Sequence, residues 1–212
     1  MKIDVNSLNR STKYSLLASC IVPRPIALIS TVGETGIANV APFSFFAPLC
    51  YDPPILCVSI GWRRSGQKKD TLRNIEFSRD FVVNIVDENL AQAMNEASFD
   101  FPPDVSEFEE AGLTALKGDK VSAPIVAESP ISMECKVVEI LSLGQPDSGS
   151  SAVLGEVLKI HIRDDLWVDG QIDPRRLKAV GRLGADFYCR TEGLFEMKRP
   201  SSPVRGRMNE HL

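Results

Sequence analysis

The sequence has little of the chemistry from which most metal and disulfide sites are built. Its 212 residues include only two histidines, His161 and His211, so a histidine-rich metal site is not expected. The five cysteines are odd in number and widely spaced, and no two stand in C-x-x-C spacing. This pattern argues against a disulfide framework or a zinc site, and it favours reduced, mostly buried thiols. No G-x-G-x-x-G motif follows an apolar run, so a Rossmann dinucleotide site is not supported.

The sequence also lacks an excess of positive charge and a long apolar run. Lysine and arginine number 24 against 28 acidic residues, a formal net charge of −4, so we expect no nucleic-acid partner and no binding to an anionic membrane surface. An anionic ligand must then be held locally. No run reaches the roughly 18 apolar residues that cross a bilayer, and the first residues lack the apolar stretch of a signal peptide. We therefore expect a cytoplasmic protein without a membrane partner.

What is present is the composition of an ordinary globular domain. A hydrophobic fraction of 43% with 25% charged residues supports a sizeable core, and the length predicts a single domain over residues 1–197. After Met197 the sequence KRPSSPVRGRMNEHL is basic and almost free of apolar residues. It predicts a mobile basic tail over residues 198–212, with an ordered arm on a partner subunit as the alternative.

Short strands joined by turns dominate the rest. Residues 25–32 (PIALISTV), a GETG turn and IANVAPF predict a β-hairpin, and ILCVSI and FVVNIV predict two further strands. Two long strands are expected at ISMECKVVEILSLG and AVLGEVLKIHI, and short helices at TLRNIEFS, ENLAQAMNEAS and PRRLKAV. Residues 98–129 read as a surface excursion with one acidic helical piece. Six or so strands with few helices favour a closed or nearly closed antiparallel β-barrel.

The segment from Pro23 to Asp70 contains the strongest candidate site. Hydroxyls, ammonium groups and a helix start come together where its third strand ends, which suits a phosphate. Asp70 would repel a phosphate, so we expect it to be the helix N-cap, with Lys69 or Thr71 facing the ligand. A solvated charged loop is the alternative. The candidate residues are Ser59, Lys68, Lys69 and Thr71, with Arg63 and Arg64 on the adjoining loop.

The APFSFF segment is the second candidate. Pro42 interrupts regular strand pairing, which leaves backbone groups free for a planar ligand beside Ser44, Phe45 and Phe46. Core filling is the alternative for Phe43 or Phe46 alone. Arg24, between two prolines, could reach a ligand edge or a second phosphate, or could be a surface arginine.

Seven blocks of this sequence resemble, in order, the flavin reductase-like, FMN-binding split-barrel family. They cover roughly residues 14–195: PRPIALIST, NVAPFSFF, DPPILCVSIG, KKDTLRNI, FVVNIV, GEVLKIHI and IDPRRLKAVGRLGADFY. The resemblance implies a mainly β fold, a split β-barrel with short peripheral helices, forming a homodimer with FMN near the interface. It implies hydride transfer from NADH or NADPH to flavin, with a flavin-accepting oxygenase as a possible partner.

The resemblance also assigns residues. It places the phosphate pocket at Lys69 and its neighbours, and it puts Arg182 and Tyr188 near the cofactor mouth. His161 alternates with isoleucines in LKIHI, so it faces either solvent or the ligand slot, where it would orient nicotinamide or flavin. The alternative function is an FMN-holding or electron-transfer protein without efficient NAD(P)H turnover. Haem is a third reading, for which His161 would be the axial ligand.

Overall fold

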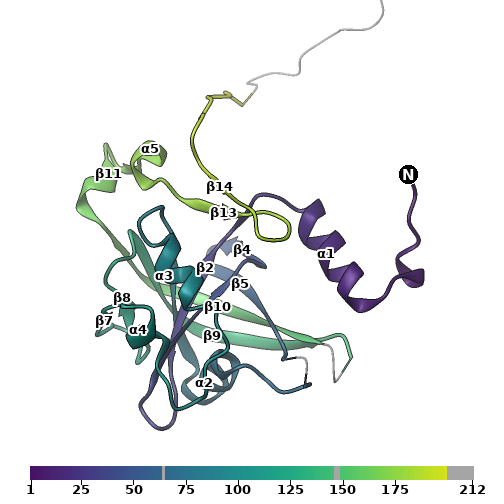
Figure 1. Ribbon diagram of the computed structural model, residues 1–212. Helices are drawn as coiled ribbons and strands as arrows, with labels where there is room; N and C mark the ends of the chain where they lie inside the picture. Colours follow the sequence, from purple (N-terminus) through teal and green to yellow (C-terminus); the bar gives the residue numbers. More distant parts are fainter. Residues whose placement is uncertain (64, 146–148, 200–212) are drawn as a thin grey trace, which may run out of the picture.

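The computed structural model describes residues 1–63, 65–145 and 149–199 as a mainly β protein with short helices (Figure 1). Arg64, one of the candidate residues, and residues 200–212, most of the expected tail, lie outside the described residues. Lys198 and Arg199 are exposed.

Seven strands form one antiparallel sheet, which confirms the predicted hairpin and both long strands. The order across the sheet is β3-β2-β6-β9-β10-β5-β4, so β3 and β4 are its two edges. The strands are β2 (Ala27–Val32), β3 (Ala38–Phe43), β4 (Phe46–Tyr51), β5 (Pro54–Gly61), β6 (Asp80–Ile85), β9 (Ile131–Leu143) and β10 (Ser150–Ile162). Only residues 44–45 separate β3 from β4, and the Ser59 N–H of β5 donates to the Phe45 carbonyl. The sheet therefore curls until its edges meet at this segment.

Alternate residues of the curled sheet fill its interior. Phe81, Ile29, Val58 and Val153 come from four different strands and are all fully buried there. Helix α2 (Asp70–Ser78) adds Leu72 and Ile75 to the same cluster. The apolar face predicted for TLRNIEFS thus packs inward and holds the start of α2 close to the barrel.

The outer face of β2 and β3 carries a second apolar cluster. Leu28 and Val40 pack there against helix α3 (Ala91–Glu96), through its N-cap Leu90 and its buried Met94. Phe108 of α4 (Glu107–Glu110) joins the same cluster. Because β2 is covered on both faces, its sequence ALISTV shows no polar alternation. The barrel is thereby fixed between an interior core and an outer helical layer.

The prediction of a surface excursion over residues 98–129 is wrong. Phe108, Ala123 and Val126 in this stretch are buried, and the short strands β7 (Ala115–Leu116) and β8 (Ile125–Val126) pair with each other. The sequence did not reveal this burial, because polar residues separate the buried side chains. In an irregular segment that covers a sheet, the buried side chains do not recur at a fixed spacing. Residues 98–129 therefore form part of the outer layer.

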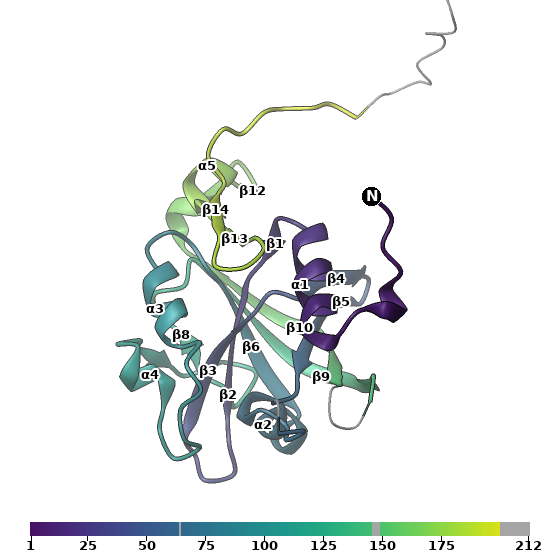
Figure 2. The same cartoon turned by 45° about the vertical axis from the view of Figure 1, so that its right-hand side comes forward.

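Helix α1 (Arg10–Cys20) was not expected from the sequence. Asn9 caps it by accepting from the Thr12 N–H, and only Ala18 is buried. Figures 1 and 2 both show α1 beside β4 and β5, and Tyr14 stacks on Phe45 with ring centroids 6.1 Å apart. Its exposed apolar side chains hid the helix, since they follow no inward-facing stripe.

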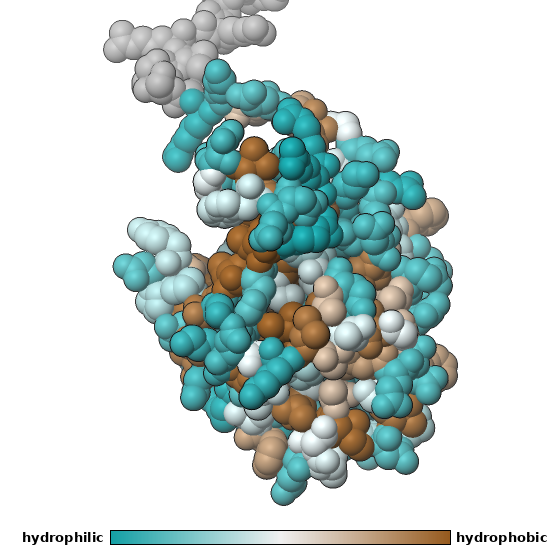
Figure 3. All heavy atoms as spheres, turned by 90° about the vertical axis from the view of Figure 1, so that its left-hand side faces the viewer, coloured by the Kyte–Doolittle hydropathy of each residue, from teal (hydrophilic) through white to brown (hydrophobic). Residues whose placement is uncertain are grey.

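The remaining elements form a C-terminal layer. β13 (Val180–Arg182) lies between β1 (Arg24–Pro25) and β14 (Tyr188–Arg190) in a three-stranded sheet. The others are η1 (Val5–Ser7), η2 (Asp164–Leu166), β11 (Trp167–Val168), β12 (Gln171–Ile172) and α5 (Pro174–Leu177). In Figure 3, which looks onto the side that carries β7 and β11, hydrophilic side chains form most of the surface and hydrophobic atoms show between them.

The cysteines are free, as expected, but most are not buried. Cys135 is buried in the barrel, whereas Cys20 and Cys50 are exposed and Cys57 and Cys189 are half-buried. Burial raises the pKa of the Cys135 thiol well above its usual range and also raises that of Cys57. The interior thiol is therefore inert, and the exposed pair lies on α1 and β4.

Candidate functional site

The candidate site is centred on residues 44–45, where the chain passes from β3 to β4. The Phe45 carbonyl accepts from the Ser59 N–H at 2.8 Å, and the Ser44 hydroxyl accepts from Arg24 Nε at 3.3 Å. The expectation that Pro42 interrupts strand pairing is wrong, because Pro42 pairs with Leu28 and Phe43 with Ala27 on the edge strand β3, where a proline is tolerated. The regular pairing ends after Phe43, and both contacts hold the backbone of residues 44–45. Arg24, Ser44, Phe45 and Ser59, expected separately as site residues, are thus brought together, and Phe46 follows as the first residue of β4.

Arg24 lies beneath this segment and is buried, with 6% of its surface exposed. Its guanidinium donates to the carbonyls of Ile21 and Leu183, each at 2.8 Å, and to that of Ala18. The Phe45 ring covers it, with 5.8 Å between Arg24 Cζ and the ring centroid. The surface-arginine interpretation is therefore wrong. Arg24 uses its donors within the chain, and it ties residues 44–45 to the β13 strand and its following loop.

The start of α2 differs from the expectation in its capping residue. Lys69 is the N-cap and makes no side-chain capping bond, whereas Asp70 is the first helical residue. The Asp70 carboxylate pairs with Arg63 at 2.6 Å and with Arg73, and Arg63 also reaches Asp100 at 2.8 Å. Asp70 is drawn out of the capping position by these two arginines. A carboxylate in the first turn still suits the helix dipole.

The two adjacent lysines have different surroundings. Lys68 is exposed and binds both oxygens of Glu76, at 2.6 and 2.9 Å. Lys69 is half-buried, its Nζ lies 5.9 Å from the centroid of the Phe43 ring, and within the described ranges it has no ion-pair partner. Phe43 directly precedes Ser44. The Lys69 ammonium is therefore available to an anion, and it lies next to residues 44–45.

Thr71 points inward rather than toward a ligand. Its hydroxyl is buried and donates to Asn39 Oδ1 at 2.9 Å, and Asn39 in turn donates to Glu107 Oε1 at 2.6 Å. Glu107 also accepts from the Val40 N–H at 3.2 Å. Burial raises the pKa of Glu107, and the Asp70 charge adds to this, while hydrogen bonds from its own and the Val40 backbone and from Asn39 oppose it.

Asn39 and Glu107 were missed by the sequence analysis. Their one signal was an amide inside the apolar strand sequence ANVAPF, which requires a buried partner. The partner carboxylate comes from a segment 68 residues away. The chain Glu107–Asn39–Thr71 links β3, just before the aromatic segment, to the first turn of α2.

Arg182 and Tyr188 meet in a neighbouring cavity of about 620 Å³ between α3 and the β13–β14 hairpin. The Arg182 guanidinium carbon lies 4.4 Å from the centroid of the Tyr188 ring, and Arg190 also lines the cavity. Arg182 is the register partner of Arg24 across β1 and β13. The two predicted residues therefore lie together, one strand away from residues 44–45. Gly181 and Gly184 leave no room for a side chain, because an added Cβ would lie 2.9 Å from Cys189 Sγ at the first and clash with Ser19 at the second.

His161 lies apart from the other candidates within this chain. Its Nε2 is 2.6 Å from Oε1 of the fully buried Glu134. Ser59 pairs with Ala152 on β10, so His161 lies nine residues further along that strand. At about 3.3 Å per residue this is roughly 30 Å of strand. The chain does not bring His161 beside Ser59.

The fold and site together define a class. A curled antiparallel sheet has its edges joined at residues 44–45, beside the start of α2, and this is the arrangement of a split barrel. Residues 18–174 match the flavin reductase like domain, which is most of the chain. The chain belongs to the flavin reductase like family, as its sequence blocks indicated.

Solved structures agree with this assignment. Nitrilotriacetate monooxygenase component B of Bacillus cereus is 34% identical, with a TM-score of 0.90 over 93% of this chain and 98% of that one. The 2-nitrobenzoate 2-nitroreductase NbaA of Pseudomonas fluorescens is 31% identical, with a TM-score of 0.83 over 97% and 100%. A flavin reductase-type protein with a split barrel domain, from Shewanella frigidimarina, is 26% identical, with a TM-score of 0.81 over 94% and 100%. Across the described residues, no helix has the length and apolarity needed to cross a membrane.

Proposed function

We propose that this protein binds FMN at residues 44–45 and the start of α2, and catalyses hydride transfer from NADH or NADPH to the flavin. The observation that carries the proposal is the position of Lys69. Its ammonium stands at the N-terminus of a nine-residue helix, next to Phe43 and free of a carboxylate in the described part of the chain. A phosphate gains there from the lysine charge, the first N–H groups and the helix dipole.

The described residues fit the other parts of FMN as well. The irregular backbone at 44–45 presents peptide groups and the Phe45 ring to a planar molecule, and Arg24 holds this path from beneath. Ser59 is half-buried on β5 beside it. Thr71 contributes through its backbone at the helix start, since its hydroxyl is engaged by Asn39.

The residues of this chain bind and orient the cofactor and exclude water from it, while the redox chemistry belongs to the cofactor. The chemistry that bound FMN would supply is the acceptance of a hydride and the transfer of its electrons to an acceptor. Lys69 holds the phosphate end, and residues 44–45 orient the ring. Arg182 and Tyr188 line the cavity on the far side of β1, where a second planar or anionic molecule has room.

The test is an absorption spectrum of the purified protein with FMN, followed by anaerobic titration with NADH and with NADPH. We expect the flavin absorbance near 450 nm to bleach on a catalytic timescale with one of the two nucleotides. Bound flavin that neither nucleotide bleaches would support the FMN-holding or electron-transfer alternative. Failure to bind FMN at all would overturn both.

A second candidate function is reduction of a nitroaromatic acid by the reduced flavin. The cavity between α3 and the β13–β14 hairpin favours it through the Tyr188 ring and two arginines, Arg182 and Arg190. The arginines pair there with Asp186 and Glu88, and an aromatic anion would take the place of these carboxylates. The NbaA structure is a 2-nitrobenzoate 2-nitroreductase of the same fold. Adding 2-nitrobenzoate to the anaerobically reduced protein tests it, since reoxidation of flavin without oxygen requires this acceptor.

The proposal includes a homodimer, a cytoplasmic location and an oxygenase that accepts reduced flavin. Exposed apolar side chains gather on two neighbouring elements, Tyr14 and Leu17 on α1 and Leu49 and Tyr51 on β4. β4 is a free sheet edge that adjoins the 44–45 segment. A second copy that covers this surface would exclude water from the flavin. The monooxygenase component among the similar structures supports an oxygenase partner.

A further inference from the structure

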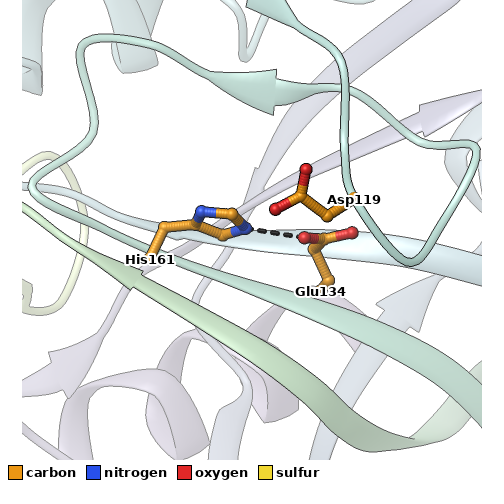
Figure 4. Close-up of side chains that lie close together, drawn as sticks. All are labelled: Asp119, Glu134 and His161. Carbon is orange, nitrogen blue, oxygen red and sulfur yellow. Dashed lines mark hydrogen bonds and ion pairs between the residues drawn. The ribbon is translucent and has the colours of Figure 1, made fainter.

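His161, Glu134 and Asp119 form a cluster that the flavin site does not use. One nitrogen of His161 and one oxygen of each carboxylate lie within 4.8 Å of one another (Figure 4). The figure shows the imidazole and both carboxylates turned toward a common point, with His161 on β10, Glu134 on β9 and Asp119 on the loop that crosses them. Three elements far apart in sequence therefore supply one imidazole and two carboxylates.

Glu134 is held so that one oxygen remains available to this point. Its Oε2 accepts from the backbone N–H groups of Lys120 and Val121, at 2.6 and 3.1 Å, and its Oε1 faces His161. Burial alone would raise the pKa of Glu134, but the bonds from His161 and from the backbone of residues 119–121 together lower it. These groups fix the orientation of a fully buried carboxylate, as the outer-sphere partners of metal ligands do.

A cation already occupies part of this cluster. Lys159, next but one to His161 on β10, places its ammonium against Asp119 and lowers the pKa of that carboxyl. The Lys159 side chain is 41% exposed, so it can swing into solvent. Asp119 is 54% exposed and His161 31%, which gives a small ion a path from solvent and room for a bound water.

We propose that Asp119, Glu134 and His161 bind a divalent transition-metal ion, Zn²⁺ by its ligand preference, in place of the Lys159 ammonium. One imidazole nitrogen with two carboxylate oxygens and a water completes four-coordination. Ligand atoms about 2.0 to 2.2 Å from zinc stand roughly 3.3 Å apart in a tetrahedron, so the 2.6 Å between His161 and Glu134 must open slightly. The ion fixes the loop that carries Asp119 to β9 and β10.

The test is titration of chelator-treated protein with ZnCl₂ by calorimetry, without flavin, together with thermal unfolding. We expect one ion per chain and a higher melting temperature with zinc. D119N and H161N should each weaken binding at least tenfold, and K159M should tighten it because the competing ammonium is gone. Asp119 is exposed, so D119N keeps the test valid should H161N fold poorly.

Controls separate this site from other zinc ligands in the chain. A C20S/C50S double variant removes the exposed thiols and H211N removes the second histidine; both should bind zinc as the wild type does. No binding by the folded wild-type protein overturns the proposal, and so does wild-type affinity in D119N. Zinc affinity lost only in C20S/C50S or H211N also overturns it. None of these outcomes depends on whether the protein binds FMN.

Discussion

Two neighbouring lysines show that the surroundings of a residue decide whether its charge is available to a ligand. Lys68 and Lys69 are adjacent and chemically identical, and the sequence offered both as phosphate ligands. In the structure Glu76 neutralises Lys68, whereas Lys69 keeps its charge beside Phe43 and the start of α2. An exposed ion pair contributes about 0 to 1 kcal/mol, so Lys68 is expected to contribute little to any site.

The two lysines form a matched pair for mutation. We expect Lys69→Ala to weaken FMN binding roughly 10- to 100-fold, because a charge-assisted hydrogen bond contributes about 1.5 to 3 kcal/mol. Lys68→Ala should change the dissociation constant less than about fivefold. Quenching of FMN fluorescence measures both. Equal affinities for Lys69→Ala and the wild type would place the phosphate elsewhere.

The raised pKa of Glu107 leads to a prediction, also at the residue scale, about how the stability of the protein depends on pH. Its folded-state pKa is raised above the ordinary 4.5, so its stabilising contribution is complete below pH 4.5 and is lost as the pH rises through the folded-state value. Glutamine does not ionise, so the Glu107→Gln variant should not show this loss of stability with rising pH. The wild type should therefore lose more stability than the variant between pH 5 and pH 8. Urea unfolding of both at the two pH values checks the difference, and parallel pH profiles would contradict it.

At the scale of elements, β10 and β6 pack closely against each other inside the barrel. Gly155 lies on β10 where a Cβ would stand 2.5 Å from Cζ of Phe81 and 3.3 Å from Cβ of Cys135. Phe81 is fully buried, so the ring would have to shift within a packed core. The glycine of the GEVLKIHI block is therefore a packing requirement of the barrel, and its φ is not in the left-handed region.

Gly155→Ala should lower the free energy of unfolding by about 1 to 3 kcal/mol or more, as overpacking of a dense core does. Gly61→Ala is the matched control, because Gly61 also lies in the sheet and nothing stands within 4 Å of its added Cβ. The control should leave stability within about 0.5 kcal/mol of the wild type. Urea unfolding at neutral pH measures all three proteins, and a neutral Gly155→Ala would contradict the contact.

At the scale of the whole molecule, the exposed apolar surface of α1 and β4 governs the expected assembly. A free, apolar edge strand is unusual on a monomer, because it invites pairing with another chain. This edge leads directly into residues 44–45. Covering it would complete the candidate site as well as bury the edge.

We expect Leu49→Glu to convert the dimer to a monomer and to weaken FMN binding. Leu116→Glu, on the exposed β7, is the control and should stay dimeric. Light scattering after size exclusion measures the mass against the 23.3 kDa of one chain. A wild-type protein that is monomeric at micromolar concentration, or a dimeric Leu49→Glu, would remove this surface from the interface.

Local pattern was enough for most strands of the seven-stranded sheet, but not for β4 or for the short strands outside that sheet. Strand alternation, proline and glycine turns and the apolar face of TLRNIEFS depend on near neighbours, so the hairpin, both long strands and α2 follow from the sequence. Seven ordered blocks, compared with known sequences, indicated the family. The residue set around 44–45 and the start of α2 was also within reach, because it lies within one continuous stretch of chain.

Only the tertiary structure decided what each candidate does. The sequence left Arg24 as either a ligand contact or a surface arginine, and the structure buries it with a hydrogen bond to Leu183, from the far end of the chain. Asp70 moves from cap to ion pair because Arg63 and Arg73 reach it. His161 joins Glu134 and Asp119 through contacts across strands and a loop. Hydrogen bonds and ion pairs between residues distant in sequence leave no periodic trace, and so folding alone determines which polar groups stay free for a ligand.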